Sequence, residues 1–110
     1  MPLLLVILAL AGARTPQAAV QRFVHPVTPA DACAQLSPAY LKQIQSAYGA
    51  CAAGVARNPK TSHIVFSHVA IHGARATLQV SYQANSATIH ERYTLVRSKG
   101  SWRITASRQL

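Results

Sequence analysis

Carboxylates are the side chains in this chain with the widest catalytic use, and they are scarce. Asp31 and Glu91 are the only acidic residues among 110, and sixty positions separate them. Catalysis by a pair of carboxylates needs two acids at one site. The sequence therefore offers little material for that chemistry, and any carboxylate-based reaction would depend on Glu91 or Asp31 alone.

Glu91 is the candidate catalytic residue. A period-two pattern predicts a strand over 87–97, and pairing Val80 with Glu91 directs its side chain toward the core beside Tyr82 and Tyr93. A carboxylate held among aromatic rings can act as a general base. Two alternatives stay open: Glu91 lies near an open end of the sheet and pairs with an arginine, or a one-residue slip in register turns it to solvent.

Other catalytic signatures are missing. His68, His72 and His90 fall on the predicted polar face, too far apart along extended strands to bind one metal ion. No Gly-x-Ser-x-Gly elbow and no phosphate-binding glycine loop occurs. We therefore expect no metal site and no cofactor, and a protein without catalytic activity is favoured over an enzyme.

The charge is strongly basic, with eleven Lys or Arg and a formal net charge of +9. Arg92 and Arg103 share the predicted polar face of the strands and are the candidate anion-binding residues. An anionic envelope polymer is a candidate partner for such a surface, although a basic face can also be merely solvated. No aromatic side chains interleave with these arginines, so we expect no nucleic-acid partner.

The N-terminus resembles an export signal. Residues 3–13 form an apolar run of eleven that ends in Ala-Gly-Ala, the small-x-small pattern of a cleavage site. Residues 1–13 are therefore expected to be a signal peptide, or a membrane anchor if they stay uncleaved, and residues 14–110 a single domain. A buried N-terminal helix is the alternative. The expected location is secreted or extracytoplasmic.

Export makes a disulfide the expected state of the two cysteines. Cys33 and Cys51 are 18 positions apart, and an even cysteine count in a small exported domain indicates a cross-link. A metal site would need His or acidic ligands near them at regular spacing, and neither cysteine has such neighbours.

The elements that position these residues change type near Pro59. Three Ser/Thr-Pro pairs predict helices starting near Pro16, Pro29 and Pro38, and a short last helix ends near Arg57. Strands are expected over 63–72, 75–83, 87–97 and 102–108. The predicted fold is α+β, with N-terminal helices packed on a curved four-stranded antiparallel meander sheet.

Two-residue turns at 73–74 and 99–100 set the expected registers of the sheet. The first pairs Val69 with Leu78 and Val65 with Tyr82; the second pairs Arg97 with Trp102 and Tyr93 with Ala106. Between these hairpins, Tyr82 is expected opposite Ile89. All the apolar partners then share one face. A pocket lined by Tyr82, Tyr93 and Trp102 is the predicted binding site.

Several segments together resemble small exported actinobacterial proteins of the nuclear transport factor 2-like superfamily, which has a cystatin-like α+β roll. They are the stretch Ala-Cys-Ala-Gln-Leu-Ser-Pro at 32–38, Cys51, and the segments 71–77, 95–97 and 100–104. The resemblance runs from about residue 20 to the C-terminus. It implies a curved sheet wrapped around helices with a pocket between them, and it leaves function open.

The sequence thus favours an exported, non-catalytic domain that binds a small ligand or a protein partner. A basic adaptor held on an anionic envelope polymer, and an isomerase- or hydrolase-like enzyme that uses Glu91, are the alternatives. Contact with a membrane is expected only through an uncleaved N-terminal segment.

Overall fold

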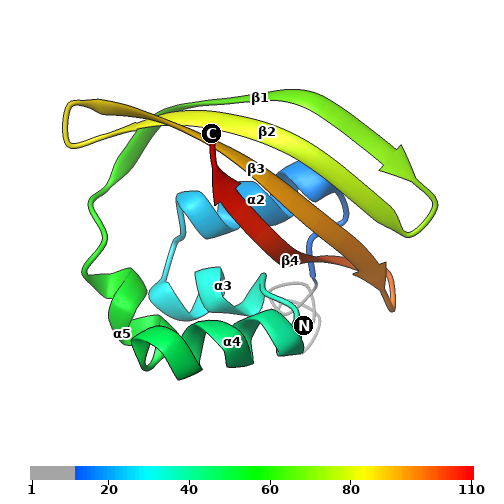
Figure 1. Cartoon of the computed structure of the whole chain (residues 1–110), viewed down its shortest axis with the longest axis horizontal. Helices are drawn as coiled ribbons and strands as arrows, with labels where there is room; N and C mark the ends of the chain where they lie inside the picture. The colour runs from blue at the N-terminus through cyan, green and yellow to red at the C-terminus, as the bar shows by residue number, and fades with distance from the viewer. Residues whose placement is uncertain (1–11) are drawn as a thin grey trace, which may run out of the picture.

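Within residues 12–110, which the computed structural model describes, helices occupy the first half and strands the second (Figure 1). The helices are α2 (Pro16–Val24), α3 (Pro29–Ala34), α4 (Pro38–Tyr48) and α5 (Cys51–Ala56). The strands are β1 (Thr61–His72), β2 (Arg75–Ala84), β3 (Ala87–Ser98) and β4 (Ser101–Gln109). The α+β class predicted from the sequence is confirmed. Apart from its last two residues, the expected signal segment lies outside the described residues.

Side-chain caps begin three of the helices, as the Ser/Thr-Pro pairs predict. Thr15, Thr28 and Ser37 each accept a hydrogen bond from the backbone N–H three residues later, at 3.1 to 3.2 Å. Proline follows each cap, where the missing N–H costs no hydrogen bond. Gly49 then ends α4 with a φ of 87°, a conformation that glycine adopts without strain.

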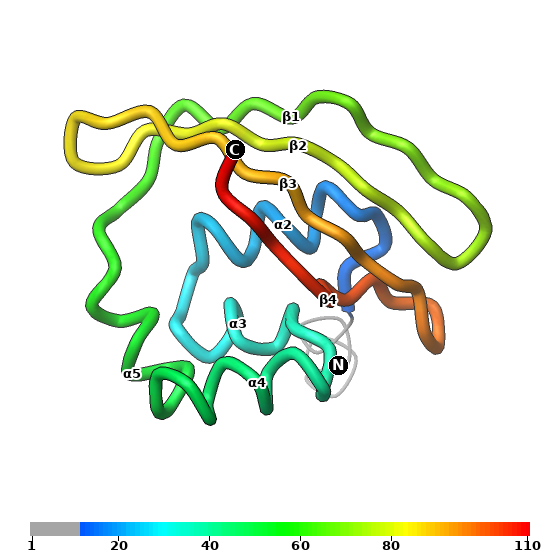
Figure 2. Tube along the Cα trace, viewed as in Figure 1, coloured from blue at the N-terminus to red at the C-terminus, as the bar shows by residue number. Residues whose placement is uncertain are grey.

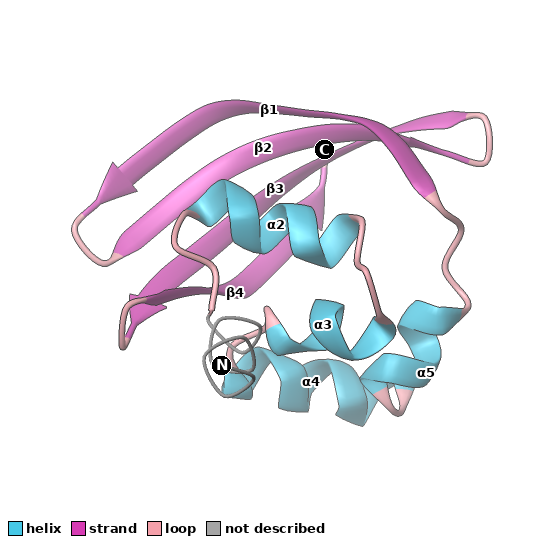
Figure 3. Cartoon of the chain, turned by 180° about the vertical axis from the view of Figure 1, so that it is seen from behind, coloured by secondary structure: helices cyan, strands magenta, loops and turns pink. Residues whose placement is uncertain are grey.

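The sheet is an open antiparallel meander in the order β1-β2-β3-β4. The central register is the one predicted: Leu78 faces Tyr93, Val80 faces Glu91, and Tyr82 faces Ile89. Because side chains alternate along a strand, this register directs Glu91 to the same face as the buried Tyr93. The sheet curves over α2, which lies along its concave face (Figures 1 and 3).

The predicted β1–β2 register is wrong beyond the turn because β1 contains bulges. Ile71 faces Ala76 as expected, but a register shift between Ser67 and Ala70 leaves Val65 opposite Ser81 rather than Tyr82. His68, within that shift, has a φ of 52°. The shift adds one residue to β1 and so reverses the direction of the side chains beyond it. Val65 therefore points away from the core and is 59% exposed.

The predicted β3–β4 register is also wrong on one side of a register shift, which lies between Thr94 and Leu95. Leu95 faces Ile104 as predicted, but Thr94 faces Ala106, so Tyr93 lies opposite Ser107 rather than Ala106. Ala106 is exposed, whereas the Ser107 hydroxyl lies 2.9 Å from the Tyr40 hydroxyl of α4. The bulge thus aims a polar side chain at the helical layer, and the hydrogen bond links β4 to α4.

The core lies between the sheet and the helices, and α3 and α4 form a further layer beyond α2 (Figure 2). A short parallel bridge joins the α3–α4 link to β4: Ile104 N–H donates to the Gln35 carbonyl and Ser37 N–H donates to the Ile104 carbonyl, each at 2.8 Å. The fully buried large apolar side chains are Tyr93, Leu78, Leu95, Ile104, Val20 and Val80.

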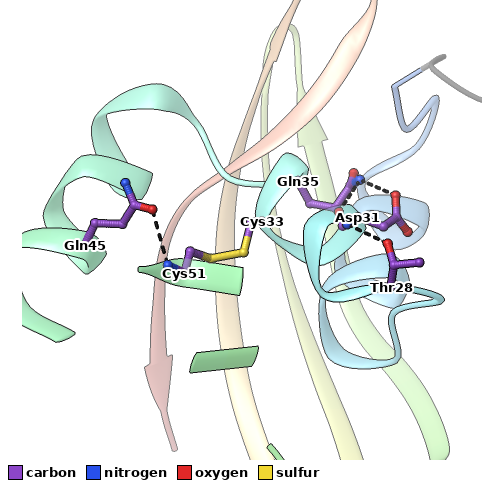
Figure 4. Close-up of a disulfide and its surroundings, with 6 residues drawn as sticks. All are labelled: Thr28, Asp31, Cys33, Gln35, Gln45 and Cys51. Atoms are coloured by element: carbon purple, nitrogen blue, oxygen red, sulfur yellow. Dashed lines mark hydrogen bonds between the residues drawn. A yellow bond between two sulfur atoms is a disulfide. The ribbon is translucent and has the colours of Figure 1, made fainter. Parts of the chain in front are cut away.

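The predicted disulfide is confirmed by the geometry. The sulfurs of Cys33 in α3 and Cys51 in α5 lie at bonding distance, and their Cα atoms are 6.1 Å apart (Figure 4). Nearby, Gln45 Oε1 accepts the Cys51 N–H at 3.2 Å, which replaces the side-chain cap that α5 lacks. An intramolecular disulfide fits an extracytoplasmic location.

No helix within residues 12–110 is long and apolar enough to cross a membrane. At the start of the described region, Ala13 is buried, and its carbonyl accepts the Trp102 N–H at 2.9 Å. The domain boundary at residue 14 stays a prediction, and the residue before it packs on β4.

Candidate functional site

A pocket of about 720 Å³ is lined by residues of both the helical half and the sheet. Three regions enclose it: the end of α2 with the following loop, the segment from α5 to β1, and the adjoining ends of β2, β3 and β4 (Figure 1). Its apolar lining comes from Phe23, Val24, Pro26, Val27, Val55, Pro59, Ala84 and Ile89. Its polar lining comes from His25, Asn58, Lys60, Thr61, Tyr82, Glu91, Tyr93 and Gln109.

Glu91 is the acidic side chain of this pocket, and two tyrosines hold it. The Tyr82 hydroxyl donates to Glu91 Oε1 at 2.8 Å, and the Tyr93 hydroxyl donates to the same oxygen at 2.9 Å. The two O–H donors together use both lone pairs of that carboxyl oxygen. The three side chains therefore form a small polar cluster on the sheet side of the wall, with Ile89 and Gln109 on the same side.

Strand geometry places this cluster. Glu91 and Tyr93 are two residues apart on β3 and share a face, and Tyr82 enters from β2 opposite Ile89. Phe23 of α2 packs edge-on against Tyr93, with ring centroids 6.1 Å apart and an angle of 70° between the planes. Such edge-to-face contacts restrict the ring position. Phe23 of α2 therefore holds the Tyr93 ring in place, and the Tyr93 hydroxyl in turn holds the Glu91 carboxylate.

Both tyrosines stay neutral donors in the folded protein. Burial raises the pKa of Tyr93 far above its ordinary value, and the charge of Glu91 and its hydrogen bond raise it further. Burial is also the largest cause of the raised pKa of Tyr82, followed by its hydrogen bond to Glu91. A phenolate beside the carboxylate would be both desolvated and repelled, so the hydroxyls keep their protons.

Glu91 has no ion-pair partner within the described part of the chain. No basic nitrogen of residues 12–110 lies within 4.0 Å of its carboxylate. The alternative in which an arginine neutralises Glu91 is therefore not what the structure shows. Lys60 and His25 line the same pocket, and His25 Nδ1 lies 3.0 Å from the Thr61 hydroxyl, which donates to the Val24 carbonyl.

The prediction that Trp102 lines the pocket is wrong. Trp102 is buried in the core at the opposite end of the β3–β4 hairpin and does not contribute to the pocket wall. The Arg97 guanidinium lies over its ring at 5.6 Å from the centroid, so the predicted cross-strand pairing of these two residues also makes a cation–π contact. The pairing with Arg97 puts Trp102 beside the 99–100 turn, whereas the pocket lies toward the other end of β3.

Arg92 and Arg103 lie on the sheet face opposite α2, here called the outer face, which also carries Thr77, Gln79 and Arg108. The two candidate residues are not brought together, because Arg103 faces Val96 whereas Arg92 faces Arg108. The β4 bulge creates the Arg92–Arg108 pair, which the unbulged register does not predict. Neither Asp31 nor Glu91 lies on this face, so its charged side chains are all basic.

The described residues contain no group of three or more His, Cys, Asp or Glu placed to hold a metal ion. The pocket residues that sequence reasoning misses come above all from the segments 23–27 and 58–61, which are the end of α2 with the following loop and the loop that leads into β1. Their prolines at 26 and 59 mark them as connections. No periodicity in the sequence indicates that the two connections meet.

Chemically, the cluster can do two things. One carboxylate oxygen is occupied by hydroxyls, so the other is available to pair with a cation or to accept a proton from a bound molecule. The surrounding apolar wall would strengthen either interaction by excluding water.

No protein-family model matches this chain, and the comparison with curated proteins finds no match. Among solved structures, it is similar to the solution structure of a SEC-C motif containing protein from Rhodopseudomonas palustris. The TM-score is 0.64 at 12% identity, over 96% of this chain and 86% of the other. At that identity the likeness concerns the fold alone.

Proposed function

We propose that this chain is an exported binding domain that takes a small amphipathic ligand into the pocket beside Glu91. The observation that carries the proposal is the Glu91–Tyr82–Tyr93 cluster on the wall of a pocket otherwise rich in apolar groups. A few well-placed polar groups on an apolar wall are the usual composition of small-molecule sites. Catalysis by the same carboxylate, in an isomerase- or hydrolase-like reaction, is the alternative use of this pocket.

The dimensions of the site support a small molecule. Its volume of about 720 Å³ falls inside the range of about 300 to 1,000 Å³ typical of ligand pockets. At its rim Val27 is 92% exposed, an apolar side chain left in water that an apolar ligand would cover. We therefore assign the apolar body of the ligand to the walls around Phe23, Val27 and Ile89.

Export is part of this proposal. The disulfide and the apolar segment at residues 3–13 both suit a protein that works outside the cytoplasm. Membership of the nuclear transport factor 2-like superfamily is likewise proposed, since a curved antiparallel sheet over helices with a pocket between them is the architecture that the sequence resemblance implies.

The test is titration with N-phenylnaphthylamine, a neutral apolar dye whose fluorescence rises out of water. We expect saturable binding that Ile89→Trp weakens about tenfold, because the larger ring fills space inside the pocket. Val65→Trp is the matched control, placing the same ring on an exposed strand position. Equal binding by both variants would show that the dye does not use the pocket.

A second function has its own observation, the facing arginines at 92 and 108 on the outer face. Like charges directly opposite each other destabilise a sheet, and a bound anion relieves that repulsion. We propose contact with an anionic envelope polymer there, as an adaptor function separate from the pocket.

Polyphosphate is a suitable probe for this second function. Binding should weaken as salt rises, and Arg92→Gln with Arg108→Gln should weaken it more than Lys42→Gln with Arg57→Gln, which removes equal charge from the helices. If the two double variants lose affinity equally, the interaction follows net charge and the outer face is not a specific site.

A further inference from the structure

One oxygen of the Glu91 carboxylate has no hydrogen-bond partner among residues 12–110. Both tyrosine hydroxyls donate to Oε1, and no hydrogen bond from the described residues reaches Oε2. Glu91 is half-buried, so water reaches it only in part. A half-buried carboxylate without an ion pair favours a partner that brings positive charge.

Glu91 and the aromatic rings beside it favour some polar head groups of a ligand over others. An acid would place like charge against Glu91. A neutral hydroxyl would form an ordinary hydrogen bond, whereas an ammonium group would form a charge-assisted one of roughly twice the strength. Phe23, Tyr82 and Tyr93 also line the pocket, and aromatic rings attract cations through their quadrupoles.

The basic character of the whole chain does not reverse this preference. The net charge of +9 is spread over the molecule, and at physiological ionic strength charges act over a Debye length of about 8 Å. Lys60 is exposed at the pocket rim and lies more than 4.0 Å from the Glu91 carboxylate. Beside the Tyr82 and Tyr93 hydroxyls, the charge that a ligand head group meets is that of Glu91, which Lys60 does not pair.

We infer that the ligand of this pocket is a cationic amphiphile, a molecule with an apolar body and a primary ammonium group that pairs with Glu91 Oε2. The inference rests on the proposed function and names the ligand class for the same site. Tyr82 and Tyr93 act as positioning residues, because they hold Oε1 and so orient Oε2 toward the ligand.

The experiment compares three probes with one tail and different head groups: octylammonium, octanol and octanoate, titrated into the full chain by calorimetry. Octylammonium should bind about tenfold more tightly than octanol, and octanoate most weakly. In Glu91→Gln the amide oxygen can still accept both tyrosine hydroxyls, so the advantage of octylammonium should vanish while octanol binding stays.

Asp31→Asn is the matched control, because it removes the same charge at α3, outside the pocket. It should keep the preference for octylammonium. If octanol or octanoate binds as tightly as octylammonium to the unaltered chain, the inference is overturned while the proposed function stands. If none of the three binds, both fall. The comparison on the unaltered chain decides the matter even where a variant does not fold.

Discussion

Replacing Cys33 and Cys51 together with serine is expected to lower the free energy of unfolding by about 3 kcal/mol. The cross-link spans 18 positions and joins α3 to α5, helices of six residues each. Helices this short are unstable alone and depend on their packing. Loss of the bond therefore frees the layer of helices that also supplies the Val55 side of the pocket.

Urea unfolding measures this effect, and reductant provides the control. Reductant should lower the midpoint of the unaltered protein and leave that of the double serine variant unchanged. Equal midpoints for the unaltered and serine proteins under oxidising conditions would contradict the cross-link. So would labelling of free thiols in protein that has not been reduced.

Tyr93→Ala is expected to be the most damaging single substitution at the site, at about 3 to 5 kcal/mol. Tyr93 is 1% exposed, packs edge-on against Phe23 and donates to Glu91. Removing the ring leaves a cavity between α2 and the sheet. The free energy of unfolding from urea titration gives the size of the loss, and a change below about 1 kcal/mol would show that the ring is not a core element.

Tyr93→Phe separates the hydroxyl from the ring. This variant keeps the packing and removes one of the two donors to Glu91, so we expect a loss of about 1 kcal/mol. Tyr40→Phe is its matched control, because that hydroxyl contacts Ser107 instead of Glu91. Weaker octylammonium binding in Tyr93→Phe alone would confirm that the hydroxyl positions the carboxylate, and equal weakening in both would contradict it.

The parts of the fold that the sequence predicts correctly depend on local rules. Capping by Thr15, Thr28 and Ser37 follows from residue type and the proline after each. The inward direction of Glu91 follows from strict alternation along β3 and from the short turn that pairs it with Val80. These features need no knowledge of how the helices pack.

The parts that could not be predicted depend on single extra residues and on loops. The shift around His68 turns Val65 outward, and the shift beyond Leu95 brings Arg108 opposite Arg92. No residue type at these positions marks a bulge in advance. Part of the pocket wall comes from the end of α2 and from two connections, which meet only when α2 and α5 are placed. Alternation along the strands therefore points to Trp102 and misses Phe23.

Backbone amide NMR during titration with octylammonium tests the central claim most directly, since it locates the bound molecule. We expect shifts concentrated at pocket positions such as Thr61, Ile89 and Glu91, with the indole N–H of Trp102 unchanged because it lies outside the pocket. Shifts confined to the outer face around Arg92, or an unchanged spectrum at saturating probe, would contradict a binding site beside Glu91.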